Sequence, residues 1–89
     1  IYIAGGGNFG NPGDNALTDN GNVTWTITVT RPQGFSSYYT FLNGTACWWD
    51  SKENLQGQTC ADPNNYNDRF LPPVYFDTII NLCFGSCSP

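Results

Sequence analysis

Acid–base chemistry in this chain would fall to its carboxylates, because the sequence contains no histidine. The 7 acidic residues are scattered: Asp14, Asp19, Asp50, Glu53, Asp62, Asp68 and Asp77. Cleavage of a glycosidic bond needs two carboxyl groups that face one another across a cleft. Asp50 and Glu53 are close in sequence, but a charged loop surface is the more ordinary explanation for them. Since no His is available to activate a Ser or Cys nucleophile either, the sequence predicts a protein that is not an enzyme.

The cysteines are the other reactive side chains: Cys47, Cys60, Cys83 and Cys87. An even number of cysteines in a chain this short is typical of disulfides formed in an oxidising compartment. A zinc site is the alternative, but zinc sites usually show paired Cys-x-x-Cys spacings or histidines. Among the possible pairings, we favour those in which both tail cysteines reach back to Cys47 and Cys60, because closing longer loops gives more stability. A local loop between Cys83 and Cys87 stays open as an alternative.

Aromatic and amide side chains in region 45–67 have the chemistry of a sugar-binding surface. Trp48 and Trp49 are adjacent, so both cannot easily point into a core. Aromatic rings stack on the apolar faces of sugars, and neighbouring Asn amides can bond the hydroxyl groups. The candidate glycan-contacting residues are Trp48, Trp49, Lys52 and Tyr66. The alternative is that one tryptophan covers a small core and packs on a disulfide.

Composition excludes several classes of partner. Charged residues make up 11% of the chain, and the net charge is −4. Nucleic acids and anionic membrane surfaces are bound through many Lys and Arg side chains, and this chain has 3. No apolar run is long enough to span a bilayer, so membrane insertion is not expected. No metal or cofactor is predicted, because turn formation explains the Asp and Asn residues near 14–22.

Two Asn-x-Thr sequons begin at Asn22 and Asn43. Both lie where a strand is expected to meet a turn, which is a surface position that a glycan can occupy. The chain also begins at Ile1 and not at Met. Together with the cysteines, these features predict the mature form of a secreted, extracellular glycoprotein.

The expected elements are β-strands. Residues 23–30 (VTWTITVT) alternate apolar and Thr side chains with period two, the pattern of a half-buried strand. Residues 36–42 are expected to form the next strand, with Tyr39 and Phe41 on one face. Since turn-forming residues separate these two strands, we expect a hairpin over 23–42.

The remaining expected elements are shorter or less regular. Strands are expected at 1–4, 68–76 and 79–84, and Pro72-Pro73 indicates that the strand 68–76 lies at an edge or a bulge. Residues about 45–67 form an irregular insert with one helical turn near 51–55, and cysteines within the insert can hold it. There is no repeat or linker, so residues 1–89 are predicted to form a single domain.

The order of these segments resembles a known family. A strand, a Gly-rich loop, LTDNGNVTWTITV, SYYTFLNG and then a tryptophan are similar to the starch-binding and glycogen-binding type of carbohydrate-binding modules. The resemblance is carried by Ile1–Gly10, Leu17–Val29 and Ser37–Trp49. It implies a small all-β, immunoglobulin-like antiparallel β-sandwich, here with a disulfide-pinned irregular segment.

The family's sugar platform matches this sequence in part. Its second tryptophan corresponds to Trp48 or Trp49, whereas its lysine falls on Thr40. Its first tryptophan falls within Phe9–Pro12, which contains none. The alternative prediction is therefore that the protein is a carbohydrate-binding module, which docks a secreted protein on a polysaccharide.

A second departure from the family concerns assembly. The family usually has a strand before the one that Ile1 begins, so this sandwich would lack a strand and expose an edge. Exposed edges accept strands from other chains. We therefore predict a non-catalytic, extracellular structural subunit that binds copies of itself in a fibre or surface array by β-strand complementation. The candidate inter-subunit residues are Ile1, Tyr2, Ile3, Ile79, Ile80 and Leu82.

Overall fold

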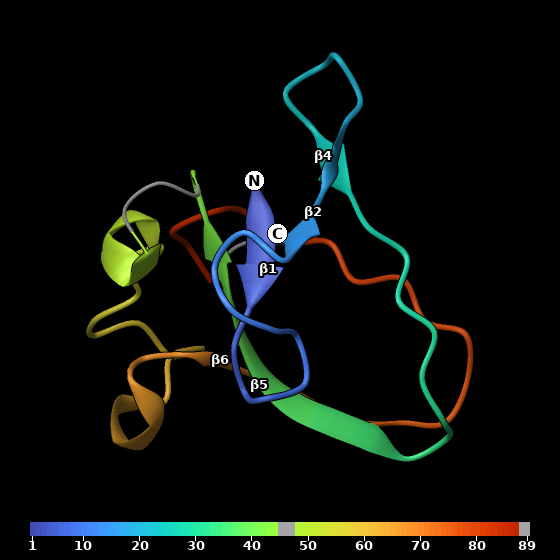
Figure 1. The fold of residues 1–89 in the computed structure, drawn as a ribbon. Coiled ribbons are helices and arrows are strands. Elements are labelled where there is room, and N and C mark those ends of the chain that lie inside the picture. Colours follow the sequence, from blue (N-terminus) through green and yellow to red (C-terminus); the bar gives the residue numbers. More distant parts are fainter. Residues whose placement is uncertain (45–47, 88–89) are drawn as a thin grey trace.

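The computed structural model describes residues 1–44 and 48–87, with Trp48 described by its backbone alone. In this part of the chain the regular elements are six β-strands and two 3₁₀ turns, and they form two antiparallel sheets. They are β1 (Tyr2–Ala4), β2 (Asn15–Ala16), β3 (Thr18–Asp19), β4 (Trp25–Thr26), β5 (Phe35–Leu42), η1 (Trp48–Ser51), η2 (Pro63–Asn65) and β6 (Arg69–Val74). The predicted small all-β fold is confirmed (Figure 1).

The main sheet has the strand order β2-β1-β5-β6, with every pair antiparallel. The long strand β5 lies inside it, between β1 and β6, and it matches the strand expected at 36–42. Gly6 allows the turn after β1 to pass close over β5, because a Cβ there would overlap Ser37 Oγ and the Tyr38 carbonyl oxygen. Its positive φ of 63° also favours glycine.

The apolar core is small and mostly aromatic. Ile3, Phe9 and Tyr39 are buried at its centre, and Phe35 and Phe41 are among the residues that pack against them. The Phe9 and Phe35 rings meet edge to face at 5.8 Å, and those of Tyr39 and Phe41 at 5.7 Å, which are favourable aromatic geometries. Tyr39 and Phe41 therefore share a face of β5, as the alternation predicted.

The second sheet is a short hairpin of β3 and β4, and it corrects the strongest sequence prediction. In region 23–30, only Trp25–Thr26 form a strand, and their partners are the upstream Thr18–Asp19. Val23 is 95% exposed, so the expected half-buried strand and the hairpin over 23–42 are both wrong. The physical reason is that β1 and β6 already take both edges of β5, so residues 27–30 cannot pair with the strand expected to be their hairpin partner.

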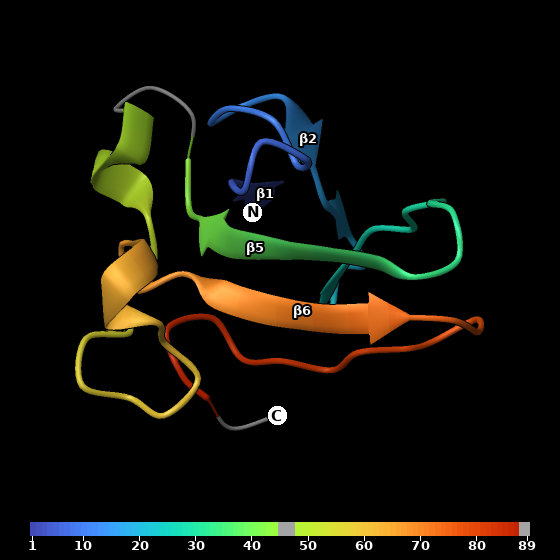
Figure 2. The ribbon, with the colours of Figure 1, turned by 90° about the horizontal axis from the view of Figure 1, so that it is seen from below.

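The strand β6 lies at the edge of the main sheet, as Pro72-Pro73 predicted. Its pairing with β5 also shifts register between Phe35 and Ser37. The strand expected at 79–84 is absent, and the chain after β6 turns back and runs outside it (Figure 2). Because proline has no N–H to donate, β6 cannot offer a regular outer ladder to this returning segment.

The insert 45–67 is irregular in its described part, as expected. The helical turn predicted near 51–55 lies slightly earlier, at Trp48–Ser51, and a second one forms at Pro63–Asn65. The insert also contributes a buried apolar side chain, Leu55, which is 1% exposed. A disulfide between Cys60 and Cys87 then joins the insert to the C-terminal tail. The predicted disulfide-pinned segment is confirmed.

Candidate functional site

The first predicted assembly segment is part of the main sheet. β1 pairs with β2 through Tyr2 and Ile3, and with β5 through Tyr2–Ala4. Ile3 is buried, and the carbonyl of Ile1 accepts a hydrogen bond of 2.8 Å from the Leu17 N–H. The prediction that Ile1, Tyr2 and Ile3 form an inter-subunit strand is therefore wrong, because β2 and β5 of the same chain already take both edges of β1.

The second predicted assembly segment has no such partners. Residues 77–82, here called the donor segment, contain no turn, bend or strand. Their backbone groups form no hydrogen bond to another described segment. Ile79 is 88% exposed, and Ile80 and Leu82 are exposed as well. The donor segment thus exposes three apolar side chains, and its backbone N–H and C=O groups form no hydrogen bond to another described segment.

A second unpaired segment was not recognised from the sequence, because its residues had been assigned to a paired strand. Residues 27–31, here called the acceptor segment, follow β4 without a turn or bend and form no backbone ladder with the described residues. A hollow of about 240 Å³ lies beside this segment, with Ile3 and Phe9 among its other lining residues. Ile27 and Val29 border the hollow and stay partly exposed.

The candidate sugar-binding residues come together only in part. Lys52 forms an ion pair with Asp68 at 2.6 Å and donates a hydrogen bond to the Tyr66 carbonyl oxygen. Its ammonium group is thus already bound within the chain. Trp49 is half-buried, and the side chain of Trp48 lies outside the described part of the structure. Tyr66 is the candidate that presents itself to solvent, with 86% of its surface exposed.

The loop that carries Tyr66 is held in an unusual conformation. Tyr66 and Asn67 both have left-handed backbone angles, with φ of 58° and 59°. Asp62 caps the preceding turn η2 by accepting hydrogen bonds from the Asn64 N–H and the Asn65 side chain, both 2.9 Å long. These bonds lower the pKa of the Asp62 carboxyl. Residues other than glycine rarely adopt these backbone angles without a structural or functional reason.

Among the charged side chains of the described residues, the two that are most buried form an ion pair that the sequence did not reveal. Glu53 comes from the insert and Arg69 from the first position of β6, and they are 3% and 2% exposed. Arg69 Nε and Nη2 donate to the two carboxylate oxygens of Glu53 at 2.9 and 2.8 Å, in the bidentate geometry that arginine favours. The guanidinium also lies over the Phe41 ring, with its carbon 5.4 Å from the ring centroid.

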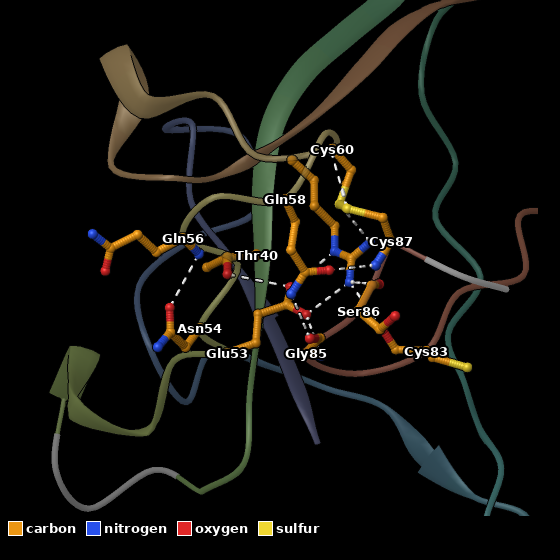
Figure 3. The surroundings of a disulfide bond; sticks show 11 residues. Thr40, Glu53, Asn54, Gln56, Gln58, Cys60, Cys83, Gly85, Ser86 and Cys87 are labelled. Atoms are coloured by element: carbon orange, nitrogen blue, oxygen red, sulfur yellow. Dashed lines mark hydrogen bonds and ion pairs between the residues drawn. A yellow bond between two sulfur atoms is a disulfide. The ribbon is translucent and has the colours of Figure 1, made fainter.

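This ion pair holds the C-terminal tail. Arg69 Nη2 donates to the carbonyl oxygens of Cys83 and Ser86, each at 3.0 Å, and the Gly85 N–H donates to Glu53 at 2.9 Å. Figure 3 shows Glu53, Gly85 and Ser86 gathered beside the disulfide. We call Glu53, Arg69, Cys60 and Cys87 together the tail clasp. Its bonds join the insert and β6 to the C-terminal tail.

The cysteines depart from the prediction at one position. Cys60 and Cys87 form a disulfide with a Cα–Cα distance of 5.5 Å. This bond is one of those expected between a cysteine of the insert and a cysteine of the tail. Cys83, however, is exposed and carries a free thiol. In Figure 3 its sulfur points away from the disulfide, because the tight turn from Cys83 to Ser86 directs the backbone toward the clasp. Cys47 lies outside the described residues.

Electrostatics support a charged clasp. Burial raises the pKa of the Glu53 carboxyl, but hydrogen bonds from Arg69 and from the Gly85 and Phe41 N–H groups outweigh burial and lower the pKa overall. The hydrogen bond to Glu53 raises the pKa of Arg69 in turn. Glu53 therefore stays ionised below the pH at which an ordinary glutamate takes up a proton.

The other predicted sites lie on the surface. Both sequon residues, Asn22 and Asn43, are exposed, and their glycosylation stays a prediction. In residues 1–44 and 48–87, no three His, Cys, Asp or Glu side chains gather as metal ligands do. The same residues form no helix that is long and apolar enough to cross a membrane.

Comparisons with protein-family models, with curated proteins and with solved structures each found no match. The resemblance to starch-binding modules therefore stays a prediction, and the function is argued from the geometry above.

Proposed function

We propose that this protein is a non-catalytic, extracellular structural subunit that assembles into a fibre or surface array by passing a strand from one copy to the next. The observation that carries the proposal is the donor segment, which exposes three apolar side chains and an unpaired backbone at one place. Unpaired backbone of this kind is what strand addition uses. Burial of one Ile side chain contributes about 1.5–3 kcal/mol, so a neighbour that covers Ile79 and Ile80 gains appreciable binding energy.

The surface suits dense packing of copies. The chain has few charged residues, and two of its three cations already lie in internal ion pairs, Lys52 with Asp68 and Arg69 with Glu53. Like-charge repulsion between neighbouring copies is therefore low. The Cys60–Cys87 disulfide is compatible with an extracellular setting, where such bonds persist.

Substitution of Ile79 by Asp is expected to abolish assembly. Negative-stain electron microscopy and sedimentation should show regular filaments for the wild type and only soluble protein for Ile79→Asp, because a charge cannot be buried unpaired in an added strand. Val23→Asp is the matched control: Val23 is also almost fully exposed, at 95%, but lies in the β3–β4 turn. Wild-type protein that stays monomeric at high concentration would overturn the proposal.

Carbohydrate binding is the second candidate, and Tyr66 favours it. Its ring is exposed although its backbone adopts a left-handed conformation, and Asn64 and Asn67 lie near it in the sequence with further amide groups. An exposed aromatic ring beside amides is suited to stacking on a sugar and bonding its hydroxyl groups. Strained, exposed positions of this type are often maintained for binding.

Under this candidate, Tyr66→Ala should weaken retention on a polysaccharide about tenfold, the effect of losing one stacking ring. The measurement is affinity electrophoresis against a panel of soluble and insoluble glycans that includes glucans. Tyr75→Ala is the control, since Tyr75 is also exposed but lies beyond β6. Absence of retention on every glycan of the panel, already for the wild type, would exclude carbohydrate binding.

A further inference from the structure

The edges of the main sheet are poor sites for strand addition. At one edge, β2 has only two residues, Asn15–Ala16. At the other, β6 contains Pro72 and Pro73, which have no N–H groups to donate to an added strand. Short strands and prolines are the usual means by which proteins protect sheet edges. The unpaired backbone that can accept a strand therefore lies elsewhere, in the acceptor segment 27–31.

The acceptor and donor segments are alike in the properties that pairing requires. Both run for five residues or more without a turn or bend, and neither has a backbone partner in the described structure. Both are rich in β-branched residues, ITVT in one and TII in the other, which favour strands. No hydrogen bond joins the two segments within the described chain, so each is available to a different molecule.

Charge gives the orientation of the pairing. Arg31 ends the acceptor segment, and it is the one cation of the chain that forms no ion pair within the described residues. Within the described residues its guanidinium donates to two carbonyl oxygens, those of Asn8 and Thr30, and lies near the rings of Phe9 and Phe35. Asp77, at the start of the donor segment, is exposed and likewise has no ion-pair partner there.

We propose that the donor segment of one copy pairs antiparallel with the acceptor segment of the next, with Asp77 directly opposite Arg31. This register places Thr78 opposite Thr30 and Ile79 opposite Val29. Opposite charges, Thr–Thr pairs and β-branched apolar pairs are the cross-strand combinations that stabilise antiparallel strands. Ile79 then lies on the same side as Val29, which borders the hollow beside Ile3 and Phe9.

Alternative registers lose these contacts together. A shift of one residue turns every donor side chain to the other side, which separates Asp77 from Arg31 and moves Ile79 away from Val29. Parallel pairing puts Asp77 near the apolar Ile27 end and leaves both charges unpaired. The antiparallel register with Asp77 opposite Arg31 is thus the one that pairs the two charges and at the same time places Ile79 opposite Val29.

This inference rests on the proposed assembly, and a charge exchange between copies tests it. Arg31→Glu and Asp77→Arg should each raise the critical concentration for filament formation about tenfold, because each puts like charges opposite one another. An equimolar mixture of the two variants should form filaments near the wild-type concentration, since every interface in an alternating filament again joins opposite charges. Sedimentation and negative-stain microscopy give the readout.

The outcomes separate the two proposals. If the wild type forms filaments and either variant alone forms them equally well, the register is wrong while the assembly proposal stands. If the two variants stay soluble when mixed, the register is likewise wrong. If the wild type forms no filaments, the assembly proposal itself fails. Recovery only on mixing also proves pairing between copies, because a contact within one chain cannot be repaired by another molecule.

A crosslink keeps the test decisive if Arg31→Glu does not fold. In a Cys83→Ser background, one copy carries Thr30→Cys and the other carries Thr78→Cys. Directly opposed residues in antiparallel strands have Cβ atoms about 4.5–5.5 Å apart, within reach of a disulfide after slight adjustment. Mild oxidation should give a heterodimer, whereas Thr30→Cys with Asn81→Cys should give none. Equal crosslinking of both pairs would overturn the register.

Discussion

Arg69→Met lowers the free energy of unfolding by about 3–5 kcal/mol, the cost of leaving one partner of a buried ion pair without the other. Glu53 is 3% exposed and would be left with the Phe41 and Gly85 N–H groups and the Thr40 hydroxyl as its hydrogen-bond donors. The carbonyl oxygens of Cys83 and Ser86 would also lose their donor. Urea denaturation followed by tryptophan fluorescence measures the loss.

The pH dependence of this loss identifies its cause. In the wild type the pKa of Glu53 is lowered, so its stabilisation is fully present above the ordinary glutamate pKa of about 4.3 and is lost as pH falls through the folded-state pKa. In Arg69→Met the main cause of that lowering is gone. The difference in unfolding free energy between wild type and variant should therefore shrink as the solution is acidified below about pH 4.

Arg69→Lys is the matched control for charge. It keeps the cation but loses the planar fork that reaches both Glu53 oxygens and two carbonyl oxygens, so we expect an intermediate loss. If Arg69→Met and Arg69→Lys were both as stable as the wild type, the clasp would not hold the tail. If the loss for Arg69→Met did not change with pH, its origin would be packing rather than the ion pair.

Cys60→Ser removes about 3.5 kcal/mol of stability, because the disulfide closes a loop with a sequence separation of 27. The same loss should follow from Cys87→Ser and from reduction of the wild type, since all three open one bond. Denaturation midpoints with and without reductant provide the measurement. A variant in which both cysteines are Ser should be no less stable than either single variant.

Cys83→Ser is the control within the same tail. Cys83 is exposed and its thiol is free, so its replacement should change stability by no more than about 0.5 kcal/mol. A loss at Cys83 as large as that at Cys60 would contradict the pairing seen in the structure. Mass spectrometry of the unreduced protein would show directly which cysteines are joined.

Several elements could be predicted because their signals are local. The alternation in SSYYTFL matches β5, and two adjacent prolines place 68–76 at an edge wherever the strand pairs. The prediction of a strand over residues 23–30 was wrong for a different reason. A period-two pattern indicates which side chains share a face, but it does not identify the partner strand. That partner is absent because β1 and β6 occupy β5, which depends on contacts far apart in sequence.

The tail clasp had no local signal either. Glu53 and Arg69 are 16 positions apart, and neither belongs to a motif. One global feature could have pointed to them: in a chain with so few charges, each Arg needs an explanation by pairing or by function. The same question, asked of all three cations, would also have drawn attention to Arg31, which forms no ion pair within the described residues. The prediction of Ile1–Ile3 as an inter-subunit strand failed because the pairing of β1 with β2 could not be foreseen.

The tail clasp has a mechanical consequence in the proposed fibre. The donor segment is attached to β6 on one side and to the clasp, beyond Cys83, on the other, so it is a tethered loop and not a free tail. A pull by the neighbouring subunit would be shared between a strand of the sheet and a covalent bond to the insert. Tension would then shear two short strands apart along their length before it could strip the C-terminus from its own subunit.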